Sequence, residues 1–193
     1  MPKLELDDQH RYTLDGKGLD GLTSTIAEAG LISGYGSDWY MQRGTFIHQA
    51  TEYWDKGELD ESTVDPHIQG YLESWKQFRK DQNYKPDEIE LKLYDPIYLY
   101  AGTIDRLPLC DLKSGVEEKW HKWQLAGYWN LCRVNGLQDQ CLNPFIVYLQ
   151  EDGGPPKLKN YTQSQMRETL KDFLCILQFV RIKRGINNRR LIL

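Results

Sequence analysis

The sequence lacks a long apolar run. No window approaches the roughly 18 consecutive apolar residues that a membrane-spanning helix needs, so we expect no such helix and no membrane partner. The first eight residues, Met1 to Asp8, are rich in acids and contain no apolar core of the kind found in secretory signals. We therefore expect an intracellular protein.

Closely spaced cysteines are also absent. The chain has four cysteines, and no two of them form a Cys-x-x-Cys pair: Cys110, Cys132, Cys141 and Cys175. Zinc ribbons and cysteine-ligated iron–sulfur clusters depend on such spacing, so we expect neither. In an intracellular protein we expect the thiols to be reduced.

The chain has no excess of basic charge. It contains 24 Lys and Arg against 28 Asp and Glu, which gives a net charge of −4 at pH 7. Nucleic-acid-binding proteins are usually basic, so this balance counts mildly against that class. It remains compatible with a local basic groove around a carboxylate-rich metal site. With 193 residues, 40% of them hydrophobic, we expect one globular domain over 1–193.

The spacing of apolar residues predicts five helices. We expect them at 23–29, 38–56, from 66 to at least 78, 117–134 and 164–183. Residues that commonly begin or end helices mark several boundaries: Gly30 and Gly57 as ends, Asp65 with Pro66 as a start, and Thr162 with Gln165 as a capping box.

Runs rich in Ile, Leu, Tyr and Thr predict strands between these helices. We expect a meander at 89–94, 97–107 and 109–113, a buried strand at 145–149, and a segment pairing back on it at 157–161. We expect short strands or irregular structure at 10–25 and a loop at 34–38. This order predicts an α/β or α+β fold with helices against a mixed sheet. Within this single domain we expect a helical region at about 20–85, a sheet with helices at about 86–185, and a basic tail at about 181–193.

Two short motifs in the middle of the chain combine acids with a lysine. Gly-Thr-Ile-Asp ends at Asp105, and Asp-Leu-Lys-Ser-Gly begins at Asp111 and includes Lys113. Side chains alternate along a strand, so Asp111 and Lys113 are expected on one face. A hairpin would bring Asp105 opposite Asp111, where two carboxylates repel unless a cation separates them, and Mg²⁺ or Mn²⁺ suits such oxygen ligands. The alternative is an ordinary charged surface hairpin.

Four other residues are candidates for the same site. Glu90, on the strand before Asp105, would supply a third carboxylate, and His48 lies in the middle of the helix at 38–56. Gln124 and Tyr128 lie four positions apart and share one helix face, where an amide and a phenol could contact a nucleotide. The ordinary alternatives are a partly buried histidine for His48 and helix packing for Gln124 and Tyr128.

Taken in order, these motifs resemble the PD-(D/E)XK nuclease superfamily, and within it the RecB-like branch that includes many phage-type exonucleases. The resemblance covers residues 10–150, and the lead-in at 10–16 is similar to that of phage members. It rests on four segments in this order: Arg43-Gly44-Thr45 with His48, Gly102-x-x-Asp105, Asp111-x-Lys113-Ser114-Gly115 and Gln124-x-x-x-Tyr128. Each motif is short, but the ordered set is fairly specific.

The resemblance implies a restriction-endonuclease-like core, in which a mixed β-sheet is flanked by α-helices. It also implies hydrolysis of DNA phosphodiester bonds with a divalent metal, Mg²⁺ or Mn²⁺. By this resemblance, Asp105 and Asp111 would be the main metal ligands, and His48 and the carbonyl of Leu112 would be further ligands. Glu90 would join the metal or orient its water.

The resemblance assigns the remaining residues to catalysis and to DNA. Lys113 would position or activate the nucleophile and offset charge on the phosphorane. Gln124 and Tyr128 would hold the DNA strand near the scissile phosphate, with Arg43 and Ser114 as further DNA-binding residues.

Two departures from the family pattern stand out. Only residues 106–110 separate Asp105 from Asp111, and the turn at 107–109 has no glycine, whereas family members often have a longer hairpin here. A three-residue turn is tight but possible. Related proteins with an iron–sulfur cluster carry a cysteine set that flanks the nuclease core. This chain lacks that set, so we expect divalent metal alone.

Aromatic and basic residues add secondary indications. Three tryptophans lie near Gln124 and Tyr128 in the sequence: Trp120, Trp123 and Trp129. They would stack on the bases of single-stranded DNA, although core packing is the expected role for at least two of them. The C-terminal stretch is basic and contains Arg181, Lys183, Arg184, Arg189 and Arg190. It would bind DNA phosphates; the alternative is a plain solvated tail.

We therefore expect a divalent-metal-dependent DNA exonuclease of phage-type recombination, replication or repair, in the cytoplasm or, if a phage encodes it, in the host cytoplasm. The alternatives are a structure-specific endonuclease of the same fold and a catalytically silent DNA-binding module. DNA ends, single-stranded or double-stranded, are the expected partner, with a single-strand annealing or single-strand-binding protein as a further one. An oligomeric ring around duplex DNA and a monomer that threads one strand are both compatible with the sequence.

Overall fold

The computed structural model describes residues 2–32 and 38–185. Its strands are β1 (Leu4–Leu6), β2 (Tyr12–Leu14), β3 (Lys17–Gly21), β4 (Glu88–Asp95), β5 (Tyr100–Leu107), β6 (Cys110–Lys113), β7 (Phe145–Tyr148) and β8 (Lys157–Asn160). Its α-helices are α1 (Leu22–Glu28), α2 (Asp38–Lys56), α3 (Pro66–Asp81), α4 (Lys119–Val134) and α5 (Gln163–Lys183). Short 3₁₀ turns occupy Glu61–Thr63 and Gln138–Cys141.

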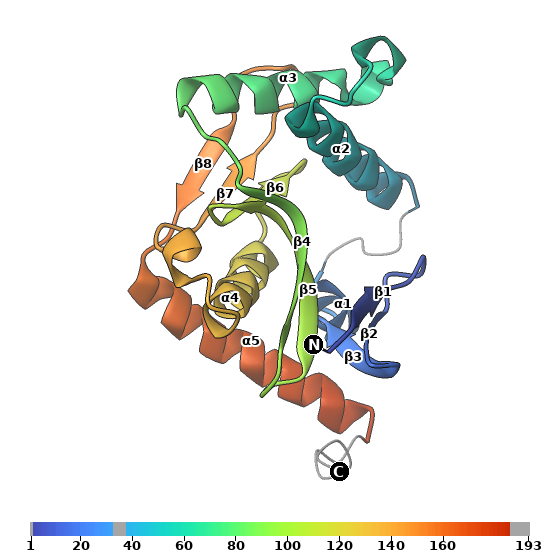
Figure 1. Ribbon diagram of the computed structural model, residues 1–193, viewed down its shortest axis with the longest axis vertical. Helices are drawn as coiled ribbons and strands as arrows, with labels where there is room; N and C mark the ends of the chain where they lie inside the picture. Colours follow the sequence, from blue (N-terminus) through green and yellow to red (C-terminus); the bar gives the residue numbers. More distant parts are fainter. Residues whose placement is uncertain (1, 33–37, 186–193) are drawn as a thin grey trace.

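One mixed sheet joins all eight strands, and β5 lies at its centre (Figure 1). The strand β4 pairs antiparallel with β5 from Glu88 to Asp95, with one pair missing at Glu90. On the other edge of β5, β3 pairs at Tyr100 and Ala101, and β6 pairs at Arg106. The sheet continues from β6 to β7 in parallel and from β7 to β8 in antiparallel pairing.

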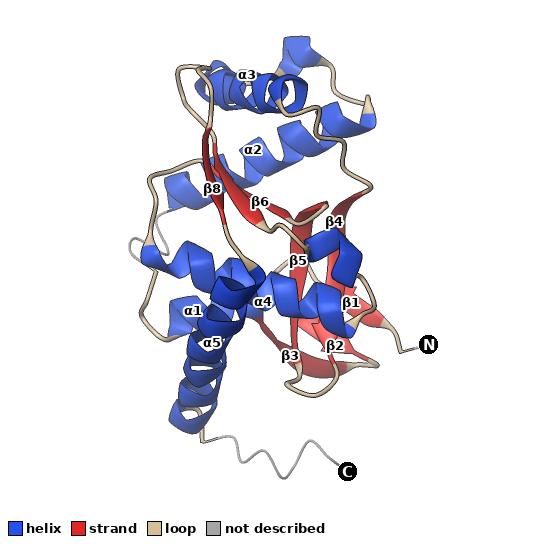
Figure 2. Cartoon of the chain, turned by 90° about the vertical axis from the view of Figure 1, so that its left-hand side faces the viewer, coloured by secondary structure: helices blue, strands red, loops and turns tan. Residues whose placement is uncertain are grey.

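Helices cover the sheet from two sides and form two apolar cores. Figures 1 and 2 show α2 and α3 together at one end of the molecule, and α1, α4 and α5 gathered on another side. The larger core joins α1, α4 and α5 to β5 and includes Ile104, Leu125 and Phe173. The smaller core joins α2 and α3 to β6 and β7 and includes Trp75 and Leu112. The predicted fold class, a mixed sheet flanked by helices, is confirmed.

Local signals place most of the helix ends where the sequence predicts them. The Asp65 carboxylate accepts a hydrogen bond from the backbone N–H of His67 at the start of α3. Thr162 and Gln165 form the predicted capping box of α5. Gly30 and Gly57, just beyond α1 and α2, have φ values of +78° and +72°, which glycine adopts without steric cost.

The structure corrects the prediction at two points and leaves two others untested. Residues 97–99 form a turn rather than the start of a strand, because the Asp95 carboxylate accepts hydrogen bonds from the N–H groups of Ile97 and Tyr98 at 2.7 and 2.8 Å. The strand β1 was not predicted, and it pairs with β2. The predicted loop at 34–38 lies outside the described residues except at Asp38, where α2 begins. Arg189 and Arg190 also lie outside them.

The described part of the basic C-terminal stretch is engaged within the protein. Arg181 donates to Asp20 Oδ2 at 2.7 Å and to the carbonyl of Leu99 at 2.9 Å. Arg184 pairs with Asp20 and with Glu28. Asp20 belongs to β3 and Glu28 to α1. The two arginines therefore connect the C-terminal end of α5 to these elements instead of forming a free basic tail.

Two further features concern the described residues as a whole. Within residues 2–32 and 38–185, none of the helices combines the length and apolar character needed to cross a membrane. All four cysteines are free thiols, and three of them are buried: Cys110, Cys132 and Cys141.

Gly70 provides a test of how closely α3 packs on the β7–β8 connection. A Cβ at this position would lie 1.7 Å from the carbonyl oxygen of Glu151, so Gly70→Ala forces two backbones apart. We expect Gly70→Ala to destabilise the protein by about 1–3 kcal/mol. The matched change Gly44→Ala in α2 meets nothing within 4 Å and should leave stability unchanged or raise it by about 0.5–1 kcal/mol. Thermal unfolding of both variants checks this; equal midpoints would contradict the packing.

Candidate metal centre and surrounding groove

The candidate site lies at an open stretch of the central strand. Because β3 and β6 occupy only the two ends of one edge of β5, no described strand pairs with this edge at residues 102–105. A groove of about 1780 Å³ opens there. Its walls come from all eight described strands, the start of α1, α2 from Arg43 to Lys56, Tyr71 of α3 and the first part of α4.

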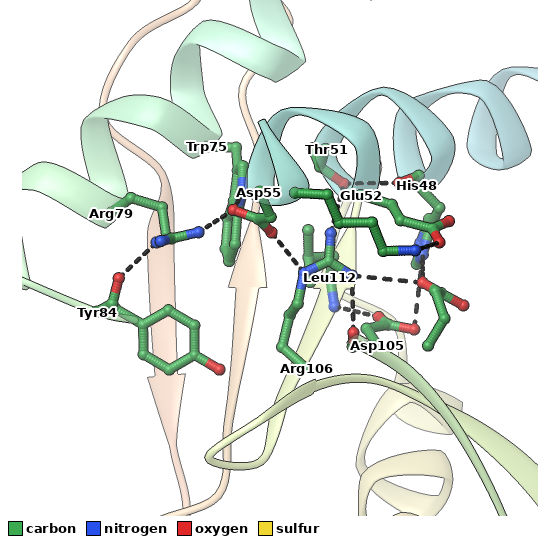
Figure 3. A network of polar contacts seen from close by, with 12 residues as sticks. His48, Thr51, Glu52, Asp55, Trp75, Arg79, Tyr84, Asp105, Arg106 and Leu112 are labelled. Atoms are coloured by element: carbon green, nitrogen blue, oxygen red, sulfur yellow. Dashed lines mark hydrogen bonds and ion pairs between the residues drawn. The ribbon is translucent and has the colours of Figure 1, made fainter. Parts of the chain in front are cut away.

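Three predicted ligands converge in this groove. His48 from α2, Glu90 from β4 and Asp105 from β5 each offer a ligand atom, and these atoms lie within 4.8 Å of one another. His48 Nδ1 is 3.5 Å from Asp105 Oδ1 and 3.9 Å from Glu90 Oε1. Figure 3 shows His48 projecting from its helix toward Asp105 on the sheet. A cluster of one imidazole and two carboxylates is a suitable ligand set for a divalent cation.

Sheet register explains why acids distant in sequence meet. The β4–β5 ladder pairs Ile89 with Arg106 and Leu91 with Ile104, so Glu90 and Asp105 face each other between these pairs. The β5–β6 hairpin pairs Arg106 with Cys110, and one step further this register sets Asp105 across from Asp111. Glu90, Asp105 and Asp111 therefore occupy neighbouring register positions on three adjacent strands. The three-residue turn in the sequence is long enough to produce this arrangement.

Glu90 has an unusual backbone conformation. Its φ angle is +52°, in the left-handed region that non-glycine residues seldom adopt. The ladder skips the Glu90–Asp105 pair, although its neighbours on both sides are paired. Conformations of this kind cost about 1–3 kcal/mol and persist where the surroundings enforce them, often at functional sites.

Asp111 and Lys113 share one face of β6, as the alternation predicts. Lys113 Nζ lies 2.7 Å from Asp111 Oδ2. Asp111 is fully buried, and neither of its oxygens has a partner with hydrogen-bond geometry among the described residues. Its carboxylate lies beside the His48, Glu90 and Asp105 cluster rather than within it. Buried carboxylate oxygens without hydrogen bonds are costly, and a bound cation would satisfy them.

Leu112 is held in place by Asp105. Its N–H donates to Asp105 Oδ2 at 2.7 Å. The carbonyl of Lys113 accepts from Leu149 N–H, which places the polar backbone groups of Lys113 on the β7 side of β6. Since successive residues of a strand direct these groups to opposite sides, the carbonyl of Leu112 is on the β5 side, together with Asp105.

The electrostatics of the site follow from burial and crowding. Burial, together with the Asp105 charge, raises the pKa of Asp111 to about 6, although Lys113 and His48 oppose the shift. Burial alone would lower the pKa of His48, but the carboxylates of Asp105 and Glu90 outweigh it and raise that pKa above its ordinary value. Lys113 and His48 therefore compensate the ionised Asp111 carboxylate only in part, and a cation next to it would favour the ionised form.

This imbalance predicts a pH-dependent gain of stability in Asp111→Asn. An acid whose pKa is about 6 in the folded state and about 4 in the unfolded state destabilises the fold when ionised. The penalty is complete above about pH 6 and disappears as the pH falls below about 4. We expect metal-free Asp111→Asn to be more stable than the unaltered protein by about 1–3 kcal/mol at pH 8, and by much less at pH 4. Calorimetry with a chelator checks this; a pH-independent difference or a loss of stability would contradict it.

Gln124 and Tyr128 lie in the groove wall and are almost completely buried. The Gln124 amide donates to Thr23 Oγ1 at 2.7 Å and to the Tyr128 hydroxyl at 3.0 Å. Gln124 Oε1 has no hydrogen-bond partner among the described residues. The Tyr128 ring packs against Gly102, where an added Cβ would lie 2.8 Å from ring atom Cε1. Both residues are therefore packed parts of the wall with polar atoms at the groove.

Arg43 and Ser114 lie together on another part of the wall. Arg43 donates to the carbonyl of Ser114 at 3.4 Å, and its guanidinium lies 5.5 Å from the centre of the Tyr71 ring. Of the three tryptophans, Trp129 is fully buried, and Trp120 lines the groove with Lys113 Nζ 5.3 Å from the centre of its ring.

Sequence reasoning missed two features of the site. His121 is buried in the groove wall, and burial, together with Lys113 and Lys159, lowers its pKa to about 3, so it is neutral at pH 7. The second feature is a buried polar network that connects α2 and α3 to Asp105 (Figure 3). One signal was available: His48, Thr51 and Asp55 recur at three- and four-residue spacing, which marks a polar stripe on one face of a helix.

Comparison with known proteins finds similarity in fold but not in sequence. No protein-family model matches the sequence, and no curated protein has a similar sequence. A solved structure of a protein from Eubacterium rectale, described as a "Putative exonuclease", superimposes with a TM-score of 0.62 at 14% sequence identity. The match covers 88% of this chain and 83% of that one. At this identity the similarity shows that the two chains share a fold.

Proposed function

We propose that this protein is a divalent-metal-dependent DNA exonuclease of the RecB-like branch of PD-(D/E)XK nucleases, with a single nuclease domain over 1–193. The observation that carries this proposal is the convergence of His48, Glu90 and Asp105 in one groove, next to the buried Asp111–Lys113 pair. The similar fold of the protein described as a "Putative exonuclease" supports it. We place its role in phage-type recombination, replication or repair.

The proposed metal site uses side chains already in proximity. Asp105 and Asp111 would be the main ligands, His48 and the carbonyl of Leu112 further ones, and Glu90 would complete the set or orient a water molecule. Hard oxygen donors with one imidazole suit Mg²⁺ or Mn²⁺. When bound, such an ion lowers the pKa of water and neutralises charge that develops on the phosphate.

The other polar groups would act on the nucleophile and the DNA. Lys113 would position the attacking water and offset negative charge on the phosphorane, and Asp111 holds its ammonium group at 2.7 Å. Gln124 and Tyr128, whose side chains are hydrogen-bonded to each other at 3.0 Å in the groove wall, would hold the strand near the scissile phosphate. Arg43 and Ser114 would hold the DNA backbone further along the groove.

Digestion of three DNA substrates tests the proposal. Linear single-stranded and double-stranded oligonucleotides labelled at either end, and covalently closed circular DNA, are incubated with Mg²⁺, with Mn²⁺ or with a chelator. We expect metal-dependent shortening of linear DNA from an end and no cutting of the circle. Cutting of the circle would identify an endonuclease of the same fold. Binding of DNA without hydrolysis under any condition would identify a silent DNA-binding module.

A further inference from the structure

Arg106 is a fully buried arginine immediately after the proposed ligand Asp105. Its side chain has 0% exposure. It donates to Asp55 Oδ2 at 2.6 Å, to the carbonyl of Asp105 at 2.7 Å, and to Thr51 Oγ1 at 3.2 Å. Its fourth contact, at 3.4 Å, is with Glu90 Oε1. One guanidinium thus contacts two neighbouring residues of the candidate metal centre.

The position of Arg106 corresponds to the gap in the β4–β5 ladder. The skipped pair consists of Glu90 and Asp105, and one nitrogen of Arg106, Nη1, donates both to the Glu90 carboxylate and to the Asp105 carbonyl. The guanidinium therefore bridges the two residues at the point where the ladder does not connect them. This bridge accounts for how Glu90 is held with its left-handed backbone and its carboxylate directed toward Asp105.

Arg106 also connects the sheet to the helix that carries His48. Thr51 Oγ1 accepts from Arg106 and donates to the carbonyl of His48 at 2.9 Å (Figure 3). The contacts of Arg106 therefore reach all three members of the cluster: two directly, and His48 through one hydroxyl group.

The charge of Arg106 is balanced away from the groove. Asp55, whose side chain is completely buried, pairs with Arg106 and also with Arg79 from α3, and it accepts from Trp75 Nε1 at 3.1 Å. A buried ion pair seldom adds much stability over an apolar replacement, because desolvating the charges offsets their attraction. A positional role explains this charged network better than stability alone.

We propose that Arg106 is a positioning residue that sets Glu90 and Asp105, and through Thr51 also His48, at the spacing a divalent cation requires. The inference rests on the proposed function, because the cation is the one that the nuclease reaction would use. Residues that orient metal ligands typically contribute about 10- to 100-fold to metal affinity. Arg79, the other arginine of the network, contacts Asp55 but none of the three ligands among the described residues.

The test compares Arg106→Lys with Arg79→Lys. Each variant keeps its positive charge and loses the forked geometry of the guanidinium. Mn²⁺ is titrated into the metal-free protein by calorimetry, and thermal unfolding is measured with a chelator. We expect Arg106→Lys to bind Mn²⁺ about 10- to 100-fold more weakly. Arg79→Lys should lose thermal stability but keep its Mn²⁺ affinity within about threefold. Equal weakening in both variants, or none in Arg106→Lys, would overturn the proposal.

A double-variant cycle separates positioning from a general loss of structure. If Arg106 acts largely through Glu90, its replacement should weaken Mn²⁺ binding much less in a Glu90→Gln background than in the unaltered protein. Full additivity of the two effects would overturn the proposal. If Arg106→Lys does not fold, Thr51→Val removes one acceptor of the network at nearly constant volume. It should still weaken Mn²⁺ binding several-fold, and unchanged affinity would overturn the proposal. Failure of the unaltered protein to bind Mn²⁺ would instead overturn the proposed function.

Discussion

Replacing Lys113 by Met is expected to lower the rate of metal-dependent DNA hydrolysis by about 10²- to 10⁴-fold, as loss of a group acting on the nucleophile usually does. Lys113 is the ammonium group next to Asp111, and it is 12% exposed at the groove, so it can reach a phosphate oxygen or an attacking water. Methionine keeps most of the aliphatic chain and removes only the ammonium group, which lies 5.3 Å from the centre of the Trp120 ring. Since Lys113 is not a proposed ligand, Mn²⁺ affinity should change much less than the rate.

A matched control separates catalysis from net charge. Lys80→Met removes one positive charge from α3, outside the groove walls, and should leave the rate within about twofold. The rate is measured on end-labelled DNA at saturating metal, and Mn²⁺ binding is measured separately. Full activity in Lys113→Met would remove this lysine from the reaction. Loss of metal binding in the same variant would instead make its role structural.

Asp105→Asn is expected to abolish detectable Mn²⁺ binding and to lower DNA hydrolysis by about 10³-fold or more, since a cation contributes several kcal/mol to charge stabilisation in the transition state. Asp105 lies 3.5 Å from His48, belongs to the same ligand cluster as Glu90, and precedes Arg106, which pairs with Cys110 next to Asp111. The amide oxygen of asparagine can still accept the Leu112 N–H that Asp105 binds at 2.7 Å. The fold should therefore survive while the site loses its main negative charge.

Glu151→Gln is the control for this substitution. Glu151 also lines the groove, where its nearest described partner is the Tyr71 hydroxyl at 3.4 Å, and it is not part of the ligand cluster. Its substitution should change Mn²⁺ affinity and rate by less than about threefold. If Asp105→Asn retained normal metal binding and hydrolysis, or if Glu151→Gln lost as much, the assigned ligand set would be wrong.

Local patterns predicted the elements that carry the candidate site. Helical spacing and the Asp65–Pro66 signal located α2 and α3, and strand alternation placed Asp111 and Lys113 on one face. The hairpin prediction for Asp105 and Asp111 agrees with the observed register. These features depend on residues close in sequence, for which side-chain periodicity and turn geometry are sufficient.

Features that depend on distant residues were not predictable in the same way. The division of one β5 edge between β3 and β6, which opens the groove, depends on strands about 90 residues apart. The Asp55–Arg106 pair joins residues 51 positions apart, and nothing local marks either partner as buried. The basic C-terminal stretch looked free because its acids, Asp20 and Glu28, lie near the other end of the sequence. Tertiary packing decides all three.

Diffraction from crystals grown with Mn²⁺, recorded where Mn²⁺ scatters anomalously, tests most directly whether the acids of β4, β5 and β6 share a cation. We predict an anomalous peak at about 2 Å from carboxylate oxygens of Asp105 and Asp111 and within reach of His48. This peak should be absent from crystals of Asp105→Asn. A fully occupied Mn²⁺ elsewhere on the molecule, with no peak between Asp105 and Asp111, would contradict the metal centre and the nuclease function proposed from it.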